Sequence, residues 1–195
     1  MGANGLALGT ERGTLAGMSK RVLCLLVDGF EETEVVTPVN LLRRGGIEVV
    51  MASLHGGGVG GRGGMRLMPD ADFEELDPSA FDLLYLPGGP GVMELLRDGR
   101  AARLAAGFHA AGKAVAAICA APLILQAAGL LENRRFTAHF SVHGDLPGAL
   151  DERVVEDERI VTSRGPGTAV DFGLALVRRL AGQQVARDVA AAIMA

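Results

Sequence analysis

The feature of this sequence that most constrains its fold is a series of apolar runs, each about as long as a β-strand. The runs are RVLCLLV at 21–27, IEVVMA at 47–52, DLLYL at 82–86 and AVAAIC at 114–119. Continuous apolar runs of this length suit parallel strands that are buried on both faces of a sheet. Because crossovers between such strands are right-handed, helices should cover both faces. The alternation therefore predicts an α/β sandwich with a mostly parallel sheet.

Helical patterns and turn signals fill the intervals between these runs. Val35, Val39 and Leu42 lie on one face of a helix that reaches 41–46. Its start has two interpretations: Thr37 as N-cap with Pro38 as the first helical residue, or a longer helix kinked at Pro38. Next along the chain we expect a flexible loop at 55–64, a short edge strand at 65–68 and a helix over 101–111 with Leu104, Phe108 and Ala111 on one face. A short helix ended by Gly129 and a hairpin at 153–163 should follow. The last two elements are a helix over 168–181, with capping-box-like spacing of Thr168 and Asp171, and a helix with Val185, Val189 and Ile193.

Length and composition indicate one domain that folds without cross-links. A chain of 195 residues buries roughly 70% of the surface that its unfolded form exposes. The Gly-rich stretch 1–17 lacks the apolar segment of a signal peptide, so we expect a disordered leader followed by a single domain at 18–195. Two cysteines are too few for a disulfide framework, and the cytoplasm is the expected compartment.

Charge and hydropathy exclude two classes of partner. The formal net charge of −4 argues against a nucleic-acid-binding protein, which normally has a basic face. Although 49% of the residues are apolar, no apolar run reaches the roughly 18 residues of a membrane-spanning helix. We therefore expect neither a nucleic acid nor a membrane as partner.

Residues with chemical potential follow four of the expected strands. DGFEETE (28–34) follows the first strand, PGGPG (87–91) the third buried strand, Cys119 the fourth, and SRGPGT (163–168) the last. In parallel sheets, ligands bind at the carboxyl ends of the strands. If these strands are parallel, an acidic cluster, two glycine turns and a thiol share one edge of the sheet.

Cys119 has two interpretations at this stage. At a strand-to-helix turn its thiolate would face a helix N-terminus, which favours negative charge, as in the nucleophile elbow of hydrolases. The flanking glycines of that elbow are replaced by Ala117 and Ala121. The alternative is a small hydrophobic residue of the core, and this is the interpretation that we give to Cys24, inside an apolar strand.

The neighbouring groups have similar alternatives. Glu31, Glu32 and Glu34 suit the first turn of a helix, where carboxylates stabilise the helix dipole, but a carboxyl beside Cys119 would stay protonated and move protons. Gly88 and Gly89 permit a tight turn, and they also let backbone amides approach an oxyanion.

Three other patterns do not indicate sites. His139 and His143 are four residues apart, but FTAHFSVHGDLPG is not a helical pattern, so we expect no metal. GFHAAGKA at 107–114 lacks the final Ser or Thr of a P-loop and runs from helix to strand. The acidic loop after the first strand is unsuited to a dinucleotide, and RGPGT is more typical of a structural turn than of an anion site.

Four motifs, in order along the chain, carry a resemblance to a known family. They are DGFEETEVVTPVNLLRRGGIEV, LPGGPG, AAICAAP and TSRGPGTAVDFGLAL. With them the chain from about residue 20 onward resembles the ThiJ/PfpI superfamily, most closely its branch of small proteins that includes the Parkinson-disease-linked deglycase and its bacterial relatives. The resemblance implies a flavodoxin-like three-layer α/β sandwich that forms a homodimer.

The resemblance also implies roles for single residues. Cys119 matches the reactive cysteine on a strained backbone, and Glu34 matches a buried glutamate whose protonated carboxyl bonds that sulfur. Gly89 and Ala120 match amides of the oxyanion site, His139 a histidine near the cysteine in some members, and Arg44 a basic residue near the pocket. A basic residue that relatives carry before the edge strand falls on Gly63, with Arg62 one position away.

These matches lead to one functional hypothesis and two alternatives. The hypothesis is a cofactor-independent glyoxalase or deglycase, a hydro-lyase or hydrolase type of enzyme, that acts on methylglyoxal, glyoxal or early glycation adducts through a hemithioacetal on Cys119. The first alternative is an oxidative-stress sensor or holdase chaperone that uses oxidation of the same thiol. The second is a cysteine peptidase or amidase, which would need a Cys-His pair.

Overall fold

The computed structural model describes residues 19–195, so the leader expected at 1–17 lies outside the described residues. The strands are β1 (Arg21–Leu26), β2 (Glu48–Ser53), β3 (Val59–Gly60), β4 (Arg66–Leu67), β5 (Ala71–Asp72), β6 (Leu83–Leu86), β7 (Ala114–Ile118), β8 (Val154–Asp157) and β9 (Ile160–Ser163). The α-helices are α1 (Glu32–Arg44), α2 (Val92–Asp98), α3 (Arg100–Ala110), α4 (Pro122–Ala127), α5 (Ala169–Ala181) and α6 (Gln183–Ala192).

The described strands build one large sheet and one small hairpin. The large sheet has the order β5-β2-β1-β6-β7-β9-β8, and β3 pairs with β4 separately. Every neighbouring pair of the large sheet is parallel except the β8–β9 hairpin. The prediction of a mostly parallel sheet is confirmed, and the expected hairpin at 153–163 is present.

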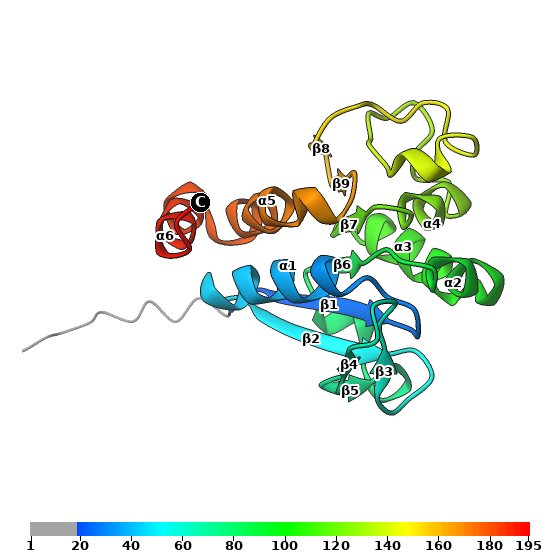
Figure 1. Ribbon diagram of the computed structural model, residues 1–195, viewed down its shortest axis with the longest axis horizontal. Helices are drawn as coiled ribbons and strands as arrows, with labels where there is room; N and C mark the ends of the chain where they lie inside the picture. The colour runs from blue at the N-terminus through cyan, green and yellow to red at the C-terminus, as the bar shows by residue number, and fades with distance from the viewer. Residues whose placement is uncertain (1–18) are drawn as a thin grey trace, which may run out of the picture.

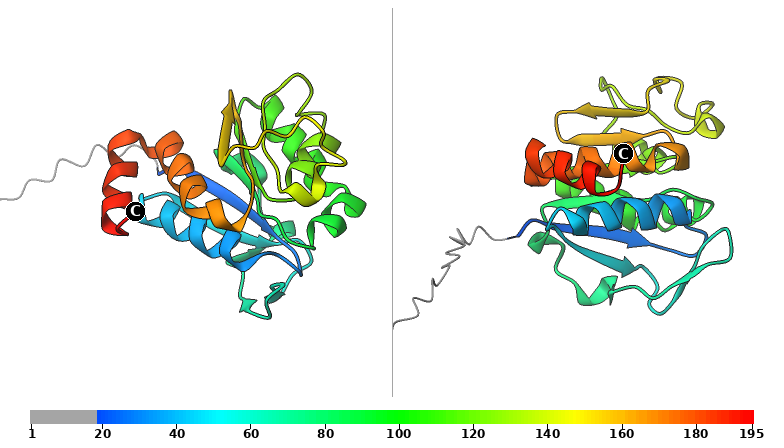
Figure 2. Two further views of the ribbon diagram at one scale, coloured as in Figure 1. Left: turned by 45° about the horizontal axis from the view of Figure 1, so that its top comes forward. Right: turned by 60° about the vertical axis from the view of Figure 1, so that its left-hand side comes forward.

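Helices cover both faces of the sheet, which makes three layers (Figures 1 and 2). Helices α1, α5 and α6 pack on one face around Leu42, Phe172 and Leu176. Helices α2, α3 and α4 pack on the other around Leu95, Phe108 and Ile124. The central strands β6 and β7 are buried on both faces, which is why their sequences are continuous apolar runs without polar alternation.

Helix α1 settles the two interpretations of its start in favour of the longer helix. It begins after Glu31, whose side chain accepts a hydrogen bond from the backbone N–H of Glu34, and it continues through Pro38. Thr37 is therefore not the N-cap. The consequence for the site is that Glu34 lies in the first helical turn, beside the end of β1.

Two local expectations were wrong, and one helix was missed. The segment at 65–68 is not an edge strand of the large sheet, because β4 pairs with β3, and β5 forms that edge instead. The helix expected over 101–111 is confirmed as α3, and the additional helix α2 precedes it, separated by Gly99 with a left-handed φ of 75°. The Thr168 hydroxyl bonds backwards to the Gly165 carbonyl and to Ser163, so it does not cap α5.

The buried face of α3 also differs from the expectation. Ala101, Ala105 and Phe108 form it, whereas Leu104 is half-buried and Ala111 is exposed beyond the helix end. Small residues on this face let the helix axis approach the sheet closely, and the larger Leu104 lies at the margin.

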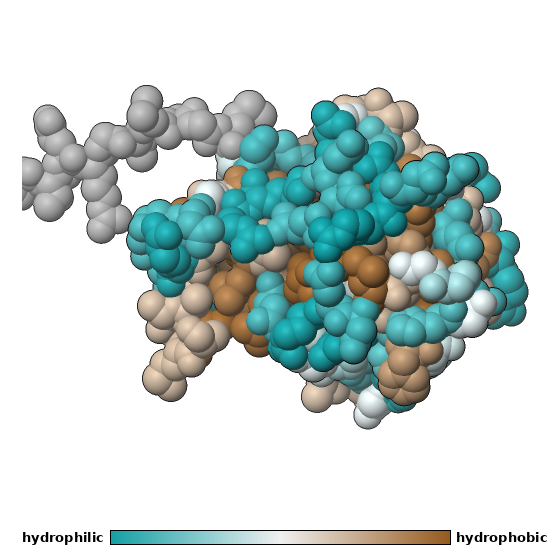
Figure 3. Space-filling view, turned by 90° about the horizontal axis from the view of Figure 1, so that it is seen from above, coloured by the Kyte–Doolittle hydropathy of each residue, from teal (hydrophilic) through white to brown (hydrophobic). Residues whose placement is uncertain are grey.

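Charged side chains protect the short edge strand β8. Arg178 and Arg179 of α5 form ion pairs with Glu156, and Arg134 does so with Asp157. The side of the molecule that carries β8 is mainly hydrophilic, with smaller apolar areas between the polar side chains (Figure 3). Such an edge resists pairing with a further strand. Within residues 19–195, no helix combines the length and apolar character needed to cross a bilayer.

Two glycines within helices lead to opposite predictions for the same substitution. A Cβ added at Gly173 of α5 would lie 2.7 Å from Leu41 Cδ1 and 3.1 Å from Pro38 Cα of α1, whereas one at Gly107 of α3 would meet no atom within 4 Å. We expect Gly173→Ala to lower the free energy of unfolding by about 1–3 kcal/mol through overpacking. Gly107→Ala should raise it by about 0.5–1 kcal/mol. Urea unfolding of both variants checks this, and equal effects would contradict the close α1–α5 contact.

Candidate active site

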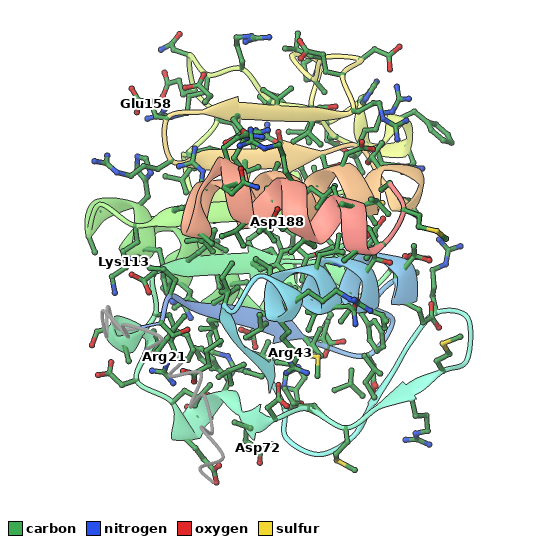
Figure 4. The ribbon with its side chains drawn as sticks, turned by 90° about the vertical axis from the view of Figure 1, so that its left-hand side faces the viewer. Arg21, Arg43, Asp72, Lys113, Glu158 and Asp188 are labelled. Atoms are coloured by element: carbon green, nitrogen blue, oxygen red, sulfur yellow. The ribbon has the colours of Figure 1, made fainter. Side chains whose placement is uncertain are left out.

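The candidate site lies at the carboxyl edge of the parallel strands. Figure 4 labels Arg21, Lys113 and Glu158, which lie at or just before the starts of β1, β7 and β9, together on one side of the molecule. The strands therefore end at the opposite side. There the Cys119 amide donates to the Ser163 carbonyl at 2.8 Å, and the Glu31 amide donates to the Gly88 carbonyl at 3.1 Å. These hydrogen bonds join the four strand ends in two pairs, β7 with β9 and the segment after β1 with the segment after β6, and β6 and β7 are themselves neighbours in the sheet.

Cys119 sits on a strained turn between β7 and α4. Its φ of 65° is left-handed, which costs a non-glycine residue on the order of 1 kcal/mol. Pro122 begins α4 three residues later, and its ring fixes the backbone at the helix start. The thiol is almost buried, with 9% of the residue exposed. This is the strained elbow that the resemblance implies.

Gly88 explains how the elbow forms without flanking glycines of its own. A Cβ on Gly88 would lie 2.6 Å from Cys119 Cβ and 2.5 Å from Glu34 Oε2. No side chain fits in that space, so the missing room comes from the loop after β6. Gly88 is therefore the residue that lets the thiol and the carboxyl approach each other.

Glu34 is completely buried, and its carboxyl is only partly satisfied. Oε2 accepts a hydrogen bond from the Gly88 amide at 3.0 Å, while Oε1 has no protein partner among the described residues. The buried Tyr85 hydroxyl donates to the Glu34 carbonyl and fixes the first turn of α1. A buried carboxyl with an unused oxygen is suited to holding or transferring a proton.

Burial and proximity couple the two groups. Burial raises the pKa of Glu34 to about 7, against the lowering effect of the adjacent Cys119 thiol. Burial, followed by the charge of Glu34, raises the pKa of the Cys119 thiol to about 12. Because a negative charge on either group disfavours one on the other, the pair holds a single proton above about pH 7, until the thiol itself titrates.

Two backbone amides favour the sulfur as the site of the negative charge. The N–H groups of Ala120 and Gly89 point to Cys119 and act to lower its pKa, in opposition to burial. Gly89 has a φ of 102°, which a side chain would not tolerate, and its α-carbon packs against the backbone of 29–31. These amides form a cradle for an anion at or next to the sulfur.

The geometry can be compared with known proteins. The model of the DJ-1/PfpI family matches residues 20–179. This chain belongs to the DJ-1/PfpI family. Its fold is that of a crystal structure of Drosophila melanogaster DJ-1beta, with a TM-score of 0.84 and 34% sequence identity over 91% of this chain and 98% of that one. The family assignment and the α/β fold predicted from sequence are therefore confirmed.

Similar members of the family have names that refer to activities. A glutathione-independent glyoxalase of Caenorhabditis elegans is 32% identical over 174 residues, which are 87% of this chain and 93% of that protein. A deglycase of Pyrococcus abyssi is 38% identical over 151 residues, which are 75% of this chain and 91% of that protein.

His139 lies next to the elbow but turns its ring elsewhere. Its amide donates to the Cys119 carbonyl at 2.8 Å, while its Nδ1 lies 2.8 Å from Ser141 Oγ and its ring stacks on Phe140. Burial, then the charges of His143 and Arg62, lower the pKa of His139, so the ring is neutral at pH 7. Within residues 19–195 the ring has no hydrogen bond to the Cys119 sulfur. The structure thus brings His139 to the site as backbone support.

Arg44 is not at the site, and this prediction was wrong. It ends α1, ten residues after Glu34, and its guanidinium bonds Asn40 Oδ1 at 2.8 Å. Ten residues of α-helix span about 15 Å. Helix α1 leads away from the carboxyl edge, so a residue at its far end does not reach the Cys119 pocket of the same subunit.

Arg62 is the basic residue that the fold does bring toward the site. Its charge acts on both Glu34 and His139, although the sequence placed it in a flexible loop. The resemblance pointed to this position, one residue away on Gly63, and hydrogen bonds between the β3–β4 turn and the loop after β1 set the place of Arg62. Within residues 19–195 no group of three His, Cys, Asp or Glu residues is arranged to hold a metal ion.

The raised pKa of Glu34 predicts how stability depends on pH. In the folded protein Glu34 keeps its proton up to about pH 7, whereas the ordinary pKa of a glutamate is 4.5. Protonated Glu34 therefore stabilises the folded state below pH 4.5, and this contribution to the free energy of unfolding is lost as pH rises to about 7. Glu34→Gln removes the titration. We expect its unfolding free energy, relative to the natural protein, to rise between pH 4 and 8 by up to about 3 kcal/mol.

Urea unfolding at several pH values measures this difference. The matched control is Glu75→Gln, at an exposed carboxyl, for which the difference should stay constant. A pH-independent difference for Glu34→Gln would show that the buried carboxyl carries no extra proton.

Proposed function

We propose that this protein is a cofactor-independent glyoxalase or deglycase, acting on methylglyoxal, glyoxal or early glycation adducts. The observation that carries the proposal is the buried Glu34–Cys119 pair, which holds one proton next to the amides of Gly89 and Ala120. The names of the related glyoxalase and deglycase support it. A glyoxalase needs a nucleophile for an aldehyde and one group that moves a proton between adjacent carbons, and the pair supplies both.

The reactive form of the pair has the proton on Glu34 and the negative charge on Cys119, and it arises when the thiol proton passes to the Glu34 carboxylate. The sulfur adds to the aldehyde carbon, a C–S bond forms, and the aldehyde oxygen takes the Glu34 proton to give a hemithioacetal. The Glu34 carboxylate then removes the proton from the carbon that bears sulfur and returns it to the neighbouring carbonyl carbon, while the hemithioacetal hydroxyl proton passes to the oxygen of that neighbouring carbon. This internal transfer oxidises the first carbon and reduces the second.

The resulting thioester is released by water. Attack at the thioester carbon breaks the C–S bond, returns the electron pair to sulfur and frees a 2-hydroxy acid. The amides of Gly89 and Ala120 stabilise negative charge on oxygen in both addition steps. The proton balance closes with one water consumed and no external oxidant or reductant.

The deglycase form applies the same steps to adducts on Cys, Lys or Arg side chains. We further propose a cytoplasmic homodimer, with a small aldehyde or a glycated side chain as substrate. The half-exposed position of His139 beside the elbow suits a site that admits a protein-bound adduct from solvent.

Methylglyoxal turnover without glutathione or added metal tests the proposal. The natural protein should form lactate, and Cys119→Ser should lose at least about a thousandfold in kcat/KM because the nucleophile is gone. Glu34→Gln should lose about a hundredfold or more because the proton carrier is gone. Lactate is measured directly, since loss of methylglyoxal alone also reports simple trapping.

Cys24→Ala is the matched control. Cys24 is fully buried in β1, and burial raises the pKa of its thiol far above the usual range, so it is unreactive. This variant should keep normal turnover. No lactate from the natural protein would end the enzyme proposal, and full activity of Glu34→Gln would refute the proton-transfer role.

A second candidate function is an oxidant sensor or holdase, favoured by the unused Oε1 of Glu34 beside the thiol. Two equivalents of peroxide convert the thiolate to a sulfinate with release of two water molecules. Intact mass after mild peroxide should then show two added oxygen atoms, located on Cys119 by peptide mapping. Oxidation at Cys24 instead would exclude the sensor.

The peptidase alternative receives the least support, because the His139 ring bonds Ser141 and not the sulfur. Amide hydrolysis that survives Glu34→Gln but is lost in His139→Ala would restore it.

A further inference from the structure

Tyr85 is a buried polar residue that the proposed reaction does not use. It is the only tyrosine of the chain and lies in β6 among leucines, with none of its surface exposed. Its neighbours on the strand have no polar side-chain atoms, and a hydroxyl without a partner is costly in a protein core. The hydroxyl of Tyr85 therefore indicates a polar group inside the core that needs a donor.

The group that needs a donor is the backbone carbonyl of Glu34. Helix α1 is continuous through Pro38, and in an α-helix each carbonyl accepts a hydrogen bond from the N–H four residues later. The residue four positions after Glu34 is Pro38, which has no N–H, and the proline ring also pushes that carbonyl away from the helix. Because Glu34 is completely buried, bulk water does not supply the missing hydrogen bond.

Tyr85 supplies that hydrogen bond from the sheet. Its hydroxyl donates to the Glu34 carbonyl. The tyrosine is fixed on its strand, where it pairs in register with Cys24 of β1 and Ala116 of β7. Its ring packs on Phe172 of α5, with 5.5 Å between the ring centroids. The donor is thus held by both neighbouring strands and by a helix.

The same hydrogen bond affects where the Glu34 carboxyl lies. The Glu34 amide donates to Glu31 Oε2 at 2.9 Å, and the Gly88 amide donates to Glu34 Oε2 at 3.0 Å. Tyr85 adds an anchor at the carbonyl of the same residue. A Cβ on Gly88 would lie 2.5 Å from Glu34 Oε2 and 2.6 Å from Cys119 Cβ, so carboxyl and thiol meet across this glycine. A small rotation of the first turn of α1 would therefore move the carboxyl relative to the sulfur.

We propose that Tyr85 is a positioning residue of the Cys119 site: its hydroxyl replaces the helical N–H that Pro38 lacks and thereby holds the Glu34 carboxyl beside the sulfur. As a statement about turnover, this rests on the proposed function. As a statement about the thiol, it is independent of turnover and is tested by alkylation.

The first test is the turnover of Tyr85→Phe, which removes the hydroxyl and keeps the ring. We expect kcat for lactate formation to fall about tenfold or more while KM stays nearly unchanged, because a displaced proton carrier slows the transfer without removing binding contacts. Glu34 itself remains in the chain, so the loss should be smaller than in Glu34→Gln.

A rescue variant separates the missing donor from every other effect of the tyrosine. Pro38→Ala gives α1 the N–H that the Glu34 carbonyl lacks. In this background the carbonyl has a donor within its own helix, so adding Tyr85→Phe should lower kcat by less than about threefold. The comparison is between Pro38→Ala and the double variant, which cancels the effect of the lost proline ring.

Alkylation by iodoacetamide follows the same contact at the sulfur. The Cys119 sulfur bonds to the CH2 carbon, the C–I bond breaks, iodide leaves and the thiol proton goes to solvent. Burial and then the charge of Glu34 raise the pKa of this thiol, so a displaced carboxylate should increase the rate constant at a fixed, mildly alkaline pH about threefold or more. In the Glu34→Gln background, which has no carboxylate, Tyr85→Phe should leave the rate constant unchanged.

The matched control is Thr137→Val, which also removes a buried hydroxyl that donates to main-chain carbonyls. Thr137 Oγ1 donates to the Leu150 carbonyl at 2.7 Å and to the Glu152 carbonyl at 2.9 Å. The variant should lose stability in urea unfolding, as a buried hydrogen bond is lost. Its kcat and its alkylation rate constant should stay near those of the natural protein.

Three results would overturn the proposal: a normal kcat in Tyr85→Phe, a tenfold fall when Tyr85→Phe is added to Pro38→Ala, or an equal change of the alkylation rate constant with and without the Glu34 carboxylate. If Tyr85→Phe alone does not fold, the comparison within the Pro38→Ala background decides. Failure of the glyoxalase proposal has a different signature, since no lactate would form while the alkylation results still report on Tyr85.

Discussion

The site depends on one close contact, in which Gly88 lets the Cys119 thiol and the Glu34 carboxyl share a space that any side chain would fill. Burial of both groups and their proximity leave one proton for two acids above about pH 7. That proton is what distinguishes this thiol from an ordinary core cysteine. Cys24 is just as buried but lacks a carboxyl partner and amides aimed at its sulfur, and it remains a packing residue.

The parallel sheet is what makes this contact possible. β1, β6 and β7 are adjacent and parallel, so Glu34, Gly88 and Cys119 follow the ends of three neighbouring strands. The helices on both faces bury these strands and supply the low-dielectric surroundings that raise the pKa of Glu34. The strained φ of Cys119 is held by the Ser163 and His139 hydrogen bonds on either side of its peptide groups. Fold and chemistry are therefore linked through backbone hydrogen bonds at a single edge.

The sequence predicted the buried strands and the site edge because both follow from local pattern. Continuous apolar runs fix the strands, and parallel topology then gathers whatever follows them. Arg44 was misplaced because its position depends on where α1 begins and in which direction it runs. The number of residues between Glu34 and Arg44 does not reveal either. The role of Gly88 also lay beyond pattern, since its tight contacts join residues 54 and 31 positions away along the chain.

The hairpin of β3 and β4 is a second case in which the sequence pattern did not predict the structure. Its many glycines suggest a flexible loop, yet Asp28, Glu32 and Asp72 each bind its backbone amides. Glycine here permits close approach by carboxylates, as the space around Gly61 shows. Hydrogen bonds from backbone amides to carboxylates, more than side-chain packing, therefore hold this glycine-rich turn in place.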